Sequence, residues 1–335
     1  MLPIAIDVMS GDHEPREYVA GVIAALTEQP ELRALVVGQP AQLDAALNGA
    51  APPGVRERME LVPASQVVAM GDSPREAIRH KKDSSMRVAI DLVKEGRAIA
   101  CVSAGNTGAL TSMAHFVLKT VAGVERAAIL SAIPAAHGHT HMLDLGANTK
   151  ASPEQLCQFA WMGTIVARDA YGLPQPRVGL LNIGEEDMKG HEVVQAAHAL
   201  IAATSLNYVG FVEGDDIFSG DVDVVVTDGF TGNVALKTME GLAGLIVSRL
   251  RQEFSASTLD RLAGFAARPV LKRVAAGLDP RRYNGACMVG LNGIVVKSHG
   301  GADSVAFARA IALAATAAER GLTSHIAQAL EGQGT

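Results

Sequence analysis

The residues best suited to bind and transform a ligand lie near the middle of the chain, in the sequence RVGLLNIGEEDMKG (177–190). Its largely apolar start, 178–183, is typical of a strand buried on both faces. Apolar residues at helical spacing follow Gly190. The turn between them therefore joins a strand to the start of a helix, where free amides bind anions. Lys189 adds a positive charge, so the pattern predicts an anion site.

The same turn also allows a purely structural interpretation. Glu185, Glu186 and Asp187 would stabilise any helix start through the helix dipole, and they would repel a bound anion. Lys189 could then simply neutralise them. This turn alone leaves both interpretations open, and the other turns of the chain favour the binding site.

Several other predicted strands end in turns made of Gly, Asn, Ser and Thr, which let the backbone approach a ligand closely. These turns are 103–108, 146–148, 228–233 and 298–303. The nucleotide patterns G-x-x-x-x-G-K-[ST] and G-x-G-x-x-G after a strand are both missing. The turns therefore favour a small anion over a nucleotide.

The sequence contains no obvious enzyme nucleophile. It lacks the G-x-S-x-G elbow, and Cys101, Cys157 and Cys287 do not lie beside a basic residue in a glycine turn. A bound substrate would then perform the attack while the protein positions it and stabilises charge. Inorganic phosphate attacking an activated acyl group fits such a site.

A metal site is an alternative at His137, His139 and His141, which would face one side of a strand. No carboxylate or thiol cluster accompanies them. A polar loop leading into a strand is the favoured interpretation, and we expect no metal and no cofactor.

Composition narrows the class of protein. The 335 residues are 48% hydrophobic but only 4% aromatic, which predicts a large aliphatic core. A net charge of −6 argues against nucleic acid as a partner. Three widely spaced cysteines suit a reducing compartment. The start of the chain lacks a basic region, and no apolar run is long enough to span a membrane, so a cytoplasmic protein is expected.

Strands and helices alternate along the chain, which predicts an α/β fold in three αβα layers with a mostly parallel sheet. We expect a single domain over 1–335, with a helical protrusion at about 240–285. Ser152, Pro153 and Gln155 predict a capped helix start. The expected strands are 4–8, 34–37, 59–62, 99–102, 127–133, 140–145, 178–183, 208–212 and 222–227.

Two details of the carboxyl half are also predicted. Asn292-Gly293 between two apolar runs indicates a two-residue hairpin and hence an antiparallel edge of the sheet. The helical stretch 234–276 should break near Ser255 and again at Pro269.

The segment 249–282 has the pattern of a surface that binds anionic membranes. It carries eight basic and three acidic residues, a net charge of +5, and its apolar residues keep helical spacing. A dimer contact or a docking face for an acidic protein remains an equal alternative. The predicted contact residues are Leu262, Phe265, Arg268, Lys272 and Arg273.

Six of these motifs together resemble the bacterial phosphate acyltransferase family. They are HKKDSSM (80–86), SAGNTGAL (103–110), LDLGAN (143–148), IGEEDMKG (183–190), TDGFTGNVALK (227–237) and SHGGAD (298–303). The resemblance covers nearly the whole chain in order, which is more specific than any single motif.

The resemblance implies a fold like that of the isocitrate and isopropylmalate dehydrogenases, and a homodimer. It implies that acyl-acyl carrier protein and inorganic phosphate are converted into acyl phosphate. A membrane glycerol-3-phosphate acyltransferase would use that product to begin phospholipid synthesis. The protein would then work at the inner face of the cell membrane as a peripheral protein.

The resemblance also assigns roles to residues. Lys189 and Asn233 match the positions that the family needs for catalysis, and basic Lys81 and Lys82 could meet the acidic carrier protein. The residues expected to bind phosphate or substrate are Ser103, Gly105, Asn106, Thr107, Gly108, Asn148 and Gly232.

Two positions depart from the family pattern. Ser10 stands where the family usually has Gly, and His191 stands where it often has Asn. Ser10 disfavours a positive φ in its turn, and His191 puts a hydrogen bond from that position in doubt.

Three other functions remain open. They are a phosphate acetyltransferase acting on acyl-coenzyme A, a metal-dependent decarboxylating dehydrogenase, and a non-enzymatic scaffold on a membrane. The dehydrogenase would need clustered aspartates and a nucleotide site that the sequence does not show.

Overall fold

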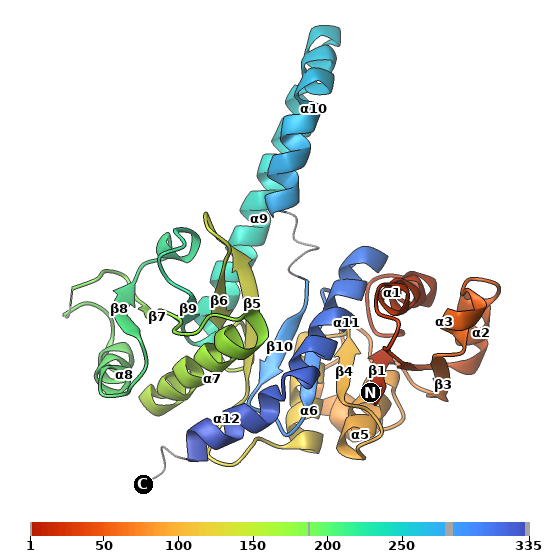
Figure 1. Cartoon of the computed structure of the whole chain (residues 1–335), viewed down its shortest axis with the longest axis horizontal. Helices are drawn as coiled ribbons and strands as arrows, with labels where there is room; N and C mark the ends of the chain where they lie inside the picture. Colours follow the sequence, from red (N-terminus) through yellow and green to blue (C-terminus); the bar gives the residue numbers. More distant parts are fainter. Residues whose placement is uncertain (1, 187, 279–283, 332–335) are drawn as a thin grey trace.

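The computed structural model describes residues 2–186, 188–278 and 284–331, except for the side chains of 272 and 275–278. In this part of the chain the strands form one eleven-stranded sheet with helices on both faces (Figure 1). The predicted α/β sandwich with a mostly parallel sheet is confirmed. In sheet order, the strands are β3 (Met59–Pro63), β2 (Ala34–Gly38), β1 (Ile4–Asp7), β4 (Ala100–Ser103), β11 (Ile294–Lys297), β10 (Ala286–Val289), β5 (Ala128–Pro134), β6 (His139–Leu143), β9 (Val224–Val226), β7 (Val178–Leu181) and β8 (Tyr208–Val212).

The sheet consists of two parallel halves that run in opposite directions. Strands β3, β2, β1, β4 and β11 are mutually parallel, as are β6, β9, β7 and β8. Between the halves, β10 is antiparallel to both β11 and β5, and β5 is antiparallel to β6. The carboxyl ends of the two halves therefore point in opposite directions along the sheet.

The predicted antiparallel edge is wrong, because the hairpin β10–β11 lies at the centre of the sheet. Apart from Lys297 at the end of β11, both of its strands are apolar, and nearly all their residues are buried, as in internal strands. The connecting loop is 290–293, wider than the predicted two residues. The segment after α6 holds it open: Val121 N–H donates to Gly290 O, and Asn292 N–H donates to Lys119 O, each at 3.0 Å.

Two layers of helices cover the sheet. One face carries α1 (Pro15–Glu28), α2 (Pro40–Leu47), α3 (Pro53–Arg56), α7 (Pro153–Tyr171), α8 (Glu192–Ala202), α11 (Ser304–Glu319) and α12 (Leu322–Glu331). The other carries α4 (Pro74–His80), α5 (Ser85–Lys94), α6 (Thr107–Leu118) and the start of α9 (Gly229–Glu253). A short 3₁₀ turn, η1 (Asp216–Phe218), precedes β9.

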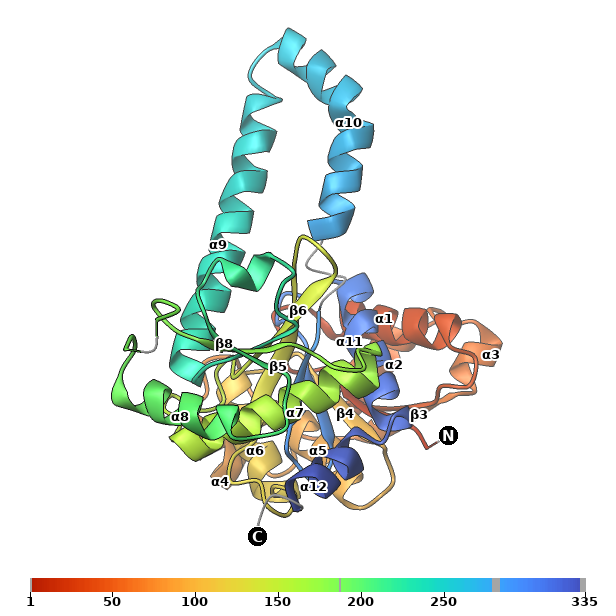
Figure 2. The ribbon, with the colours of Figure 1, turned by 60° about the vertical axis from the view of Figure 1, so that its left-hand side comes forward.

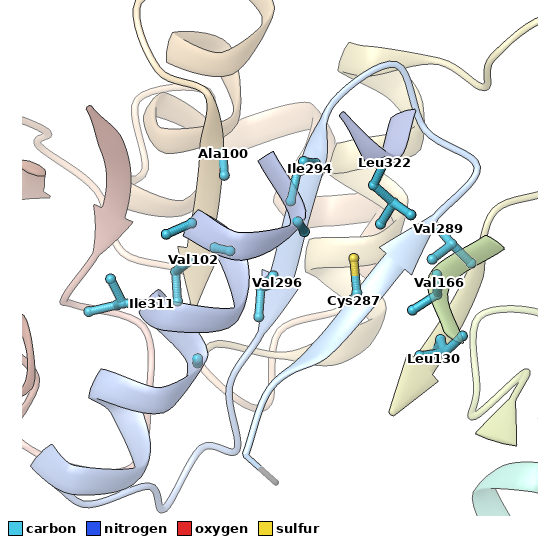
Figure 3. Close-up of a cluster of buried hydrophobic side chains, with 14 of the residues drawn as sticks. Ala100, Val102, Leu130, Val166, Cys287, Val289, Ile294, Val296, Ile311 and Leu322 are labelled. Carbon is cyan, nitrogen blue, oxygen red and sulfur yellow. The ribbon is translucent and has the colours of Figure 1, made fainter. Parts of the chain in front are cut away.

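Side chains alternate between two cores, one under each helical layer. On β4, Ala100 and Val102 join the core under α11, whereas Cys101 joins the core under α5 and α6. Figure 3 shows the first core where the central hairpin meets α11 and α12. Burying each large aliphatic side chain contributes about 1.5–3 kcal/mol, so this aliphatic packing fixes the strands whose ends form the candidate site.

The predicted capped start of α7 is confirmed. Ser152 Oγ accepts the Gln155 N–H at 3.2 Å, and Gln155 Oε1 accepts the Ser152 N–H at 3.1 Å. This reciprocal pair satisfies two donors that a helix start would otherwise leave free.

Helices α9 and α10 (Thr258–Leu278) both project from the sheet; they meet at the far end and lie apart nearer the sheet (Figure 2). We call this pair the arm. The predicted break near Ser255 is confirmed, since α9 ends at Glu253 and α10 begins at Thr258. The predicted break at Pro269 is wrong, because α10 continues through it. Proline has a helical φ and removes one backbone donor, so a helix can continue at a cost of about 3 kcal/mol. Among the described residues, none of the helices combines the length and hydropathy that a membrane span requires.

Candidate anion-binding site

The first cluster of candidate residues lies where β1 and β4 end. Ser103 Oγ donates to Asp7 Oδ2 at 2.7 Å and accepts the Gly105 N–H at 3.1 Å. The fully buried Asp7 also accepts the N–H groups of Met9 and Ser10, at 3.1 and 3.2 Å. Ser103 therefore shapes the turn by joining the two strand ends, and its hydroxyl is already committed to internal partners.

The start of α6 offers amide donors beside that turn. Asn106 Oδ1 accepts the Ala109 N–H at 2.9 Å, and Asn106 Nδ2 donates to Met70 O at 2.6 Å. Thr107 and Gly108 follow as the first helical residues and are exposed. Their N–H groups have no intrahelical acceptor, because the first turn of a helix leaves such donors free. They can therefore hold an anion.

Gly105 is required by close packing under the same turn. A Cβ atom at this position would lie 2.4 Å from Met86 Cε and 2.6 Å from Ser10 Cβ. The departure from the family pattern at Ser10 is accommodated without a positive φ. However, the Ser10 hydroxyl is buried without a hydrogen-bond partner in the described structure.

Sequence reasoning missed Lys297, the last residue of β11. It pairs in register with Ser103 on the parallel neighbour β4. The side chain is buried, and its Nζ donates to Ala104 O at 3.3 Å and to Ser298 O. Burial lowers the pKa of Lys297 to about 8; Lys237 also lowers it, whereas Asp12 and Asp7 oppose the shift. The sequence pattern that could have indicated it is a lysine at the end of an apolar strand, directly before a glycine turn.

The second cluster lies where β6 and β9 end, around the buried Asp144. Its carboxylate accepts the N–H groups of Ile129, Gly146, Ala147 and Asn148 at 2.7–3.1 Å. Burial raises the pKa of Asp144, and these hydrogen bonds oppose the shift. The Asn148 side chain donates to Ala127 O at 2.8 Å and to Asp144 at 3.0 Å. Asn148 thus holds its turn in shape.

Asn233 stands against this turn on the first part of α9. Asp228 caps the helix by accepting the Thr231 N–H at 2.8 Å. A Cβ atom on Gly232 would lie 1.9 Å from Asp144 O, so only glycine fits there. A Cβ atom on Gly146 would lie 3.5 Å from Asn233 Cβ. Asn233 is exposed, and its amide makes no hydrogen bond within the described residues.

Helix α9 leads from the second cluster toward the first. Its residues Ala235, Leu236 and Met239 pack on the core that lies under α5 and α6. Lys237, one turn beyond Asn233, comes near enough to Lys297 to lower the pKa of that group. Within the described part of the chain, no hydrogen bond or ion pair joins the two clusters directly.

Lys189 lies apart from both clusters, in the loop after β7. Its side chain is 45% exposed, and its described ionic partner is Glu186 at 4.0 Å. Ile183 and Met188 in the same loop are also exposed. His191 is the first flanking residue of α8 and makes no capping hydrogen bond with its side chain. The structure therefore does not bring Lys189 into contact with Asn233 or the Ser103 turn; Asp187 lies outside the described residues.

The predicted contact residues for partners differ in their availability. Lys81 Nζ donates to Val67 O at 2.8 Å and pairs with Asp72, whereas Lys82 is exposed. On the arm, Leu262 and Phe265 are 62% and 73% exposed. Arg268 and Arg273 are exposed as well, and the Lys272 side chain lies outside the description.

The histidines of β6 form an aromatic cluster. The rings of His139 and His141 lie 4.9 Å apart, and Tyr171 lies 4.2 Å from His141. Burial lowers the pKa of His141 to about 4, which favours a neutral ring. Among the residues that the structure describes, no three His, Cys, Asp or Glu side chains gather as metal ligands would.

Residues 2–325 match the family model described as "Fatty acid synthesis protein". The chain belongs to this family. It is 52% identical to a phosphate acyltransferase from Methylococcus capsulatus over 98% of this chain and 96% of that relative. It is likewise 52% identical to a phosphate acyltransferase from Alcanivorax borkumensis, over 100% and 99% of the two chains.

Solved structures of other proteins share the fold of this family member. The EutD phosphotransacetylase from Staphylococcus aureus matches with a TM-score of 0.61 at 15% identity, covering 94% of both chains. A phosphotransacetylase from Streptococcus pyogenes matches with a TM-score of 0.62 at 15% identity, covering 95% of this chain and 94% of that one. A putative 4-hydroxythreonine-4-phosphate dehydrogenase from Salmonella typhimurium reaches 0.54 at 16% identity, covering 94% and 99%. The predicted dehydrogenase-like fold, shared with phosphotransacetylases, is confirmed.

Proposed function

We propose that this protein transfers a fatty acyl group from acyl-acyl carrier protein to inorganic phosphate, producing acyl phosphate. The observation that carries the proposal is the 52% identity, over 98% of the chain, to a relative named phosphate acyltransferase. The donor-rich start of α6 and the neighbouring Lys297 support it, because they suit a phosphate ion.

The reaction needs positioning more than covalent catalysis. A phosphate oxygen attacks the carbonyl carbon of the acyl thioester, and a tetrahedral oxyanion forms. Its collapse makes the acyl phosphate and breaks the carbon–sulfur bond, and the electron pair leaves on the carrier's thiolate. Because a thiolate leaves readily, no strong general acid is required. Burial raises the pKa of the Cys101 and Cys287 thiols, which disfavours the thiolate form that a nucleophile needs.

Asn233 and Lys189 take the two roles that act on developing charge. The Asn233 amide is exposed beside the rigid Asp144 turn and is available to donate to the oxyanion. Lys189 lies on an exposed loop, so it reaches the phosphate by a movement of that loop on substrate binding.

The binding partners that we propose are set by the substrates and by the product of the reaction. The acidic carrier protein would contact the exposed Lys82. Lys81, through its ion pair with Asp72, would stabilise the neighbouring loop. The acyl phosphate would pass to a membrane glycerol-3-phosphate acyltransferase. We further propose a homodimer and a peripheral position on the inner face of the membrane, reached by the arm.

The exposed residues of the arm suit a peripheral position on the membrane. Leu259, Leu262 and Phe265 lie one turn apart near its tip and are 77%, 62% and 73% exposed. Exposed Arg261 and Arg268 flank them. Apolar side chains beside arginines bind at an anionic lipid surface. Arg281 and Arg282, which contribute to the predicted charge, lie outside the described residues.

The proposed reaction is tested by incubating the protein with acyl-acyl carrier protein and phosphate, and by detecting acyl phosphate with mass spectrometry. We expect acyl phosphate to form only with phosphate present, and faster than from acyl-coenzyme A at equal concentration. Preference for acyl-coenzyme A would favour the phosphate acetyltransferase-like alternative. No product from either donor would leave the scaffold as the better interpretation.

A further inference from the structure

Lys297 is a buried cation whose described hydrogen-bond partners are backbone carbonyls. Its side chain is 8% exposed, and no ion pair to it is found among the described residues. An ammonium group has three donors, and the carbonyls of Ala104 and Ser298 accept two of them. A buried charge is normally paired, so the remaining donor calls for an anion.

The surroundings of Lys297 indicate where that anion sits. Ala104 belongs to the glycine turn, and the free N–H groups of Thr107 and Gly108 follow it on α6. Ser10 lies against Gly105 through its Cβ atom and is 1% exposed, and its hydroxyl has no described hydrogen-bond partner. Asp7 accepts three hydrogen bonds from its own turn and Ser103, and among the described residues no ion pair joins it to Lys297.

We propose that Lys297 is a phosphate-binding residue, which holds the attacking phosphate together with the Thr107 and Gly108 amides and the Ser10 hydroxyl. This inference rests on the proposed function and adds a binding residue to it. Lys297 is fixed by the sheet before substrate arrives, so phosphate binds at a preformed point. Lys189 then acts later, on the charge that develops during transfer.

The charge of Lys297 depends on a set of identifiable neighbours. Lys237 on α9 disfavours its protonated form, whereas Asp12 after β1 and Asp7 on β1 favour it. With a pKa of about 8, the ammonium is charged below that pH and loses its proton above it. Anion binding at this point should therefore weaken as the pH rises through about 8.

The first experiment compares Lys297→Met with Lys94→Met, a control that removes an exposed lysine from the end of α5. Phosphate binding is measured by calorimetry, and the Michaelis constants by acyl phosphate formation. In Lys297→Met we expect phosphate affinity to fall about tenfold to a hundredfold, as loss of a charged hydrogen bond implies. The Michaelis constant for acyl-acyl carrier protein should stay unchanged. Unchanged phosphate affinity in a folded Lys297→Met protein would overturn the proposal.

A second experiment does not depend on the folding of Lys297→Met. Sulfate keeps the same charge between pH 7 and 9, and its binding to the unmodified protein is measured by calorimetry over this range. We expect affinity to fall above pH of about 8, and the midpoint to move to higher pH in Lys237→Met, because Lys237 lowers the pKa of Lys297. A flat profile, or an unmoved midpoint, would overturn the assignment. If the protein binds anions in this way but makes no acyl phosphate, the proposed function fails and the anion site stands.

Discussion

Among single residues, Lys189 and Asn233 differ in how firmly the fold holds them. Asn233 stands against the glycine turn, which Asp144 fixes by accepting three of the turn's N–H groups and one from Ile129 on β5. Lys189 lies on an exposed loop with a distant carboxylate partner. A donor that is fixed in advance stabilises the transition state without reorganising, whereas a residue on a loop also controls closure. Replacing each of the two residues should therefore change the kinetics in a different way.

Replacing Asn233 with alanine should lower kcat by about a hundredfold to a thousandfold, the effect of losing one oxyanion donor. The Michaelis constants for phosphate and acyl-acyl carrier protein should change little, since the donor acts mainly in the transition state. Steady-state kinetics with both substrates measure this. A raised Michaelis constant with an unchanged kcat would make Asn233 a plain binding residue.

Replacing Lys189 with alanine should reduce turnover by about a hundredfold or more, because it removes the loop's cation and leaves Glu185 and Glu186 to repel phosphate. Stability should change little, since the Lys189 side chain is 45% exposed. Turnover and thermal unfolding are compared with those of Lys94→Ala. Near-normal turnover in a folded Lys189→Ala protein contradicts the assignment.

The site was partly predictable from sequence, and the reason differs between residues. Ser103, Asn148 and Gly232 stand in motifs that marked turns correctly, but their task of shaping those turns needs three-dimensional partners. Lys297 was missed because a lysine after an apolar run belongs to no known motif. Its burial becomes visible only when β11 pairs with β4.

At the scale of elements, apolar runs located the strands well, but they carried no information on direction. The reversal between the halves depends on β10 pairing with β5, more than a hundred residues away in the sequence. Local turn chemistry indicated a hairpin and could not place it in the sheet. Capping chemistry is local, and for that reason the start of α7 was predicted correctly.

The arm supplies the clearest test at this scale. Replacing Leu262 and Phe265 together with glutamate should abolish sedimentation with anionic liposomes, because it removes exposed apolar area and adds negative charge. Acyl phosphate formation without membranes should remain. The control pair Leu200→Glu and Val305→Glu places the same charges on exposed residues of α8 and α11.

Two outcomes would contradict the membrane role of the arm. One is sedimentation of the arm variant equal to that of the unmodified protein at low salt. The other is loss of a dimer in the arm variant, seen by gel filtration, in a protein that never sedimented with liposomes. The second result would make the apolar tip a contact with a second copy.

For the whole molecule, the buried His141 links stability to pH. Burial lowers its pKa from 6.5 to about 4, so the unfolded chain binds a proton that the folded protein does not. The free energy of unfolding should fall as the pH drops through this range, by roughly 2 kcal/mol at pH 5 from this residue, and not above neutral pH.

His141→Phe should lessen this acid sensitivity. The Asp223 carbonyl keeps a hydrogen bond from the His141 backbone N–H at 2.8 Å, so the change leaves no buried acceptor unpaired. Urea unfolding at pH 7 and pH 5 measures the effect, with His137→Asn at an exposed site as the control. Equal acid sensitivity in His141→Phe and the unmodified protein would show that other groups dominate.

The central claim is that phosphate itself attacks the acyl thioester. The most direct measurement supplies phosphate labelled with ¹⁸O at every oxygen, together with acyl-acyl carrier protein, and follows the label by mass spectrometry. We expect acyl phosphate that retains all the labelled oxygens, with one of them bonded to the acyl carbon. Release of free fatty acid carrying solvent oxygen, with no labelled acyl phosphate at any time, would contradict it.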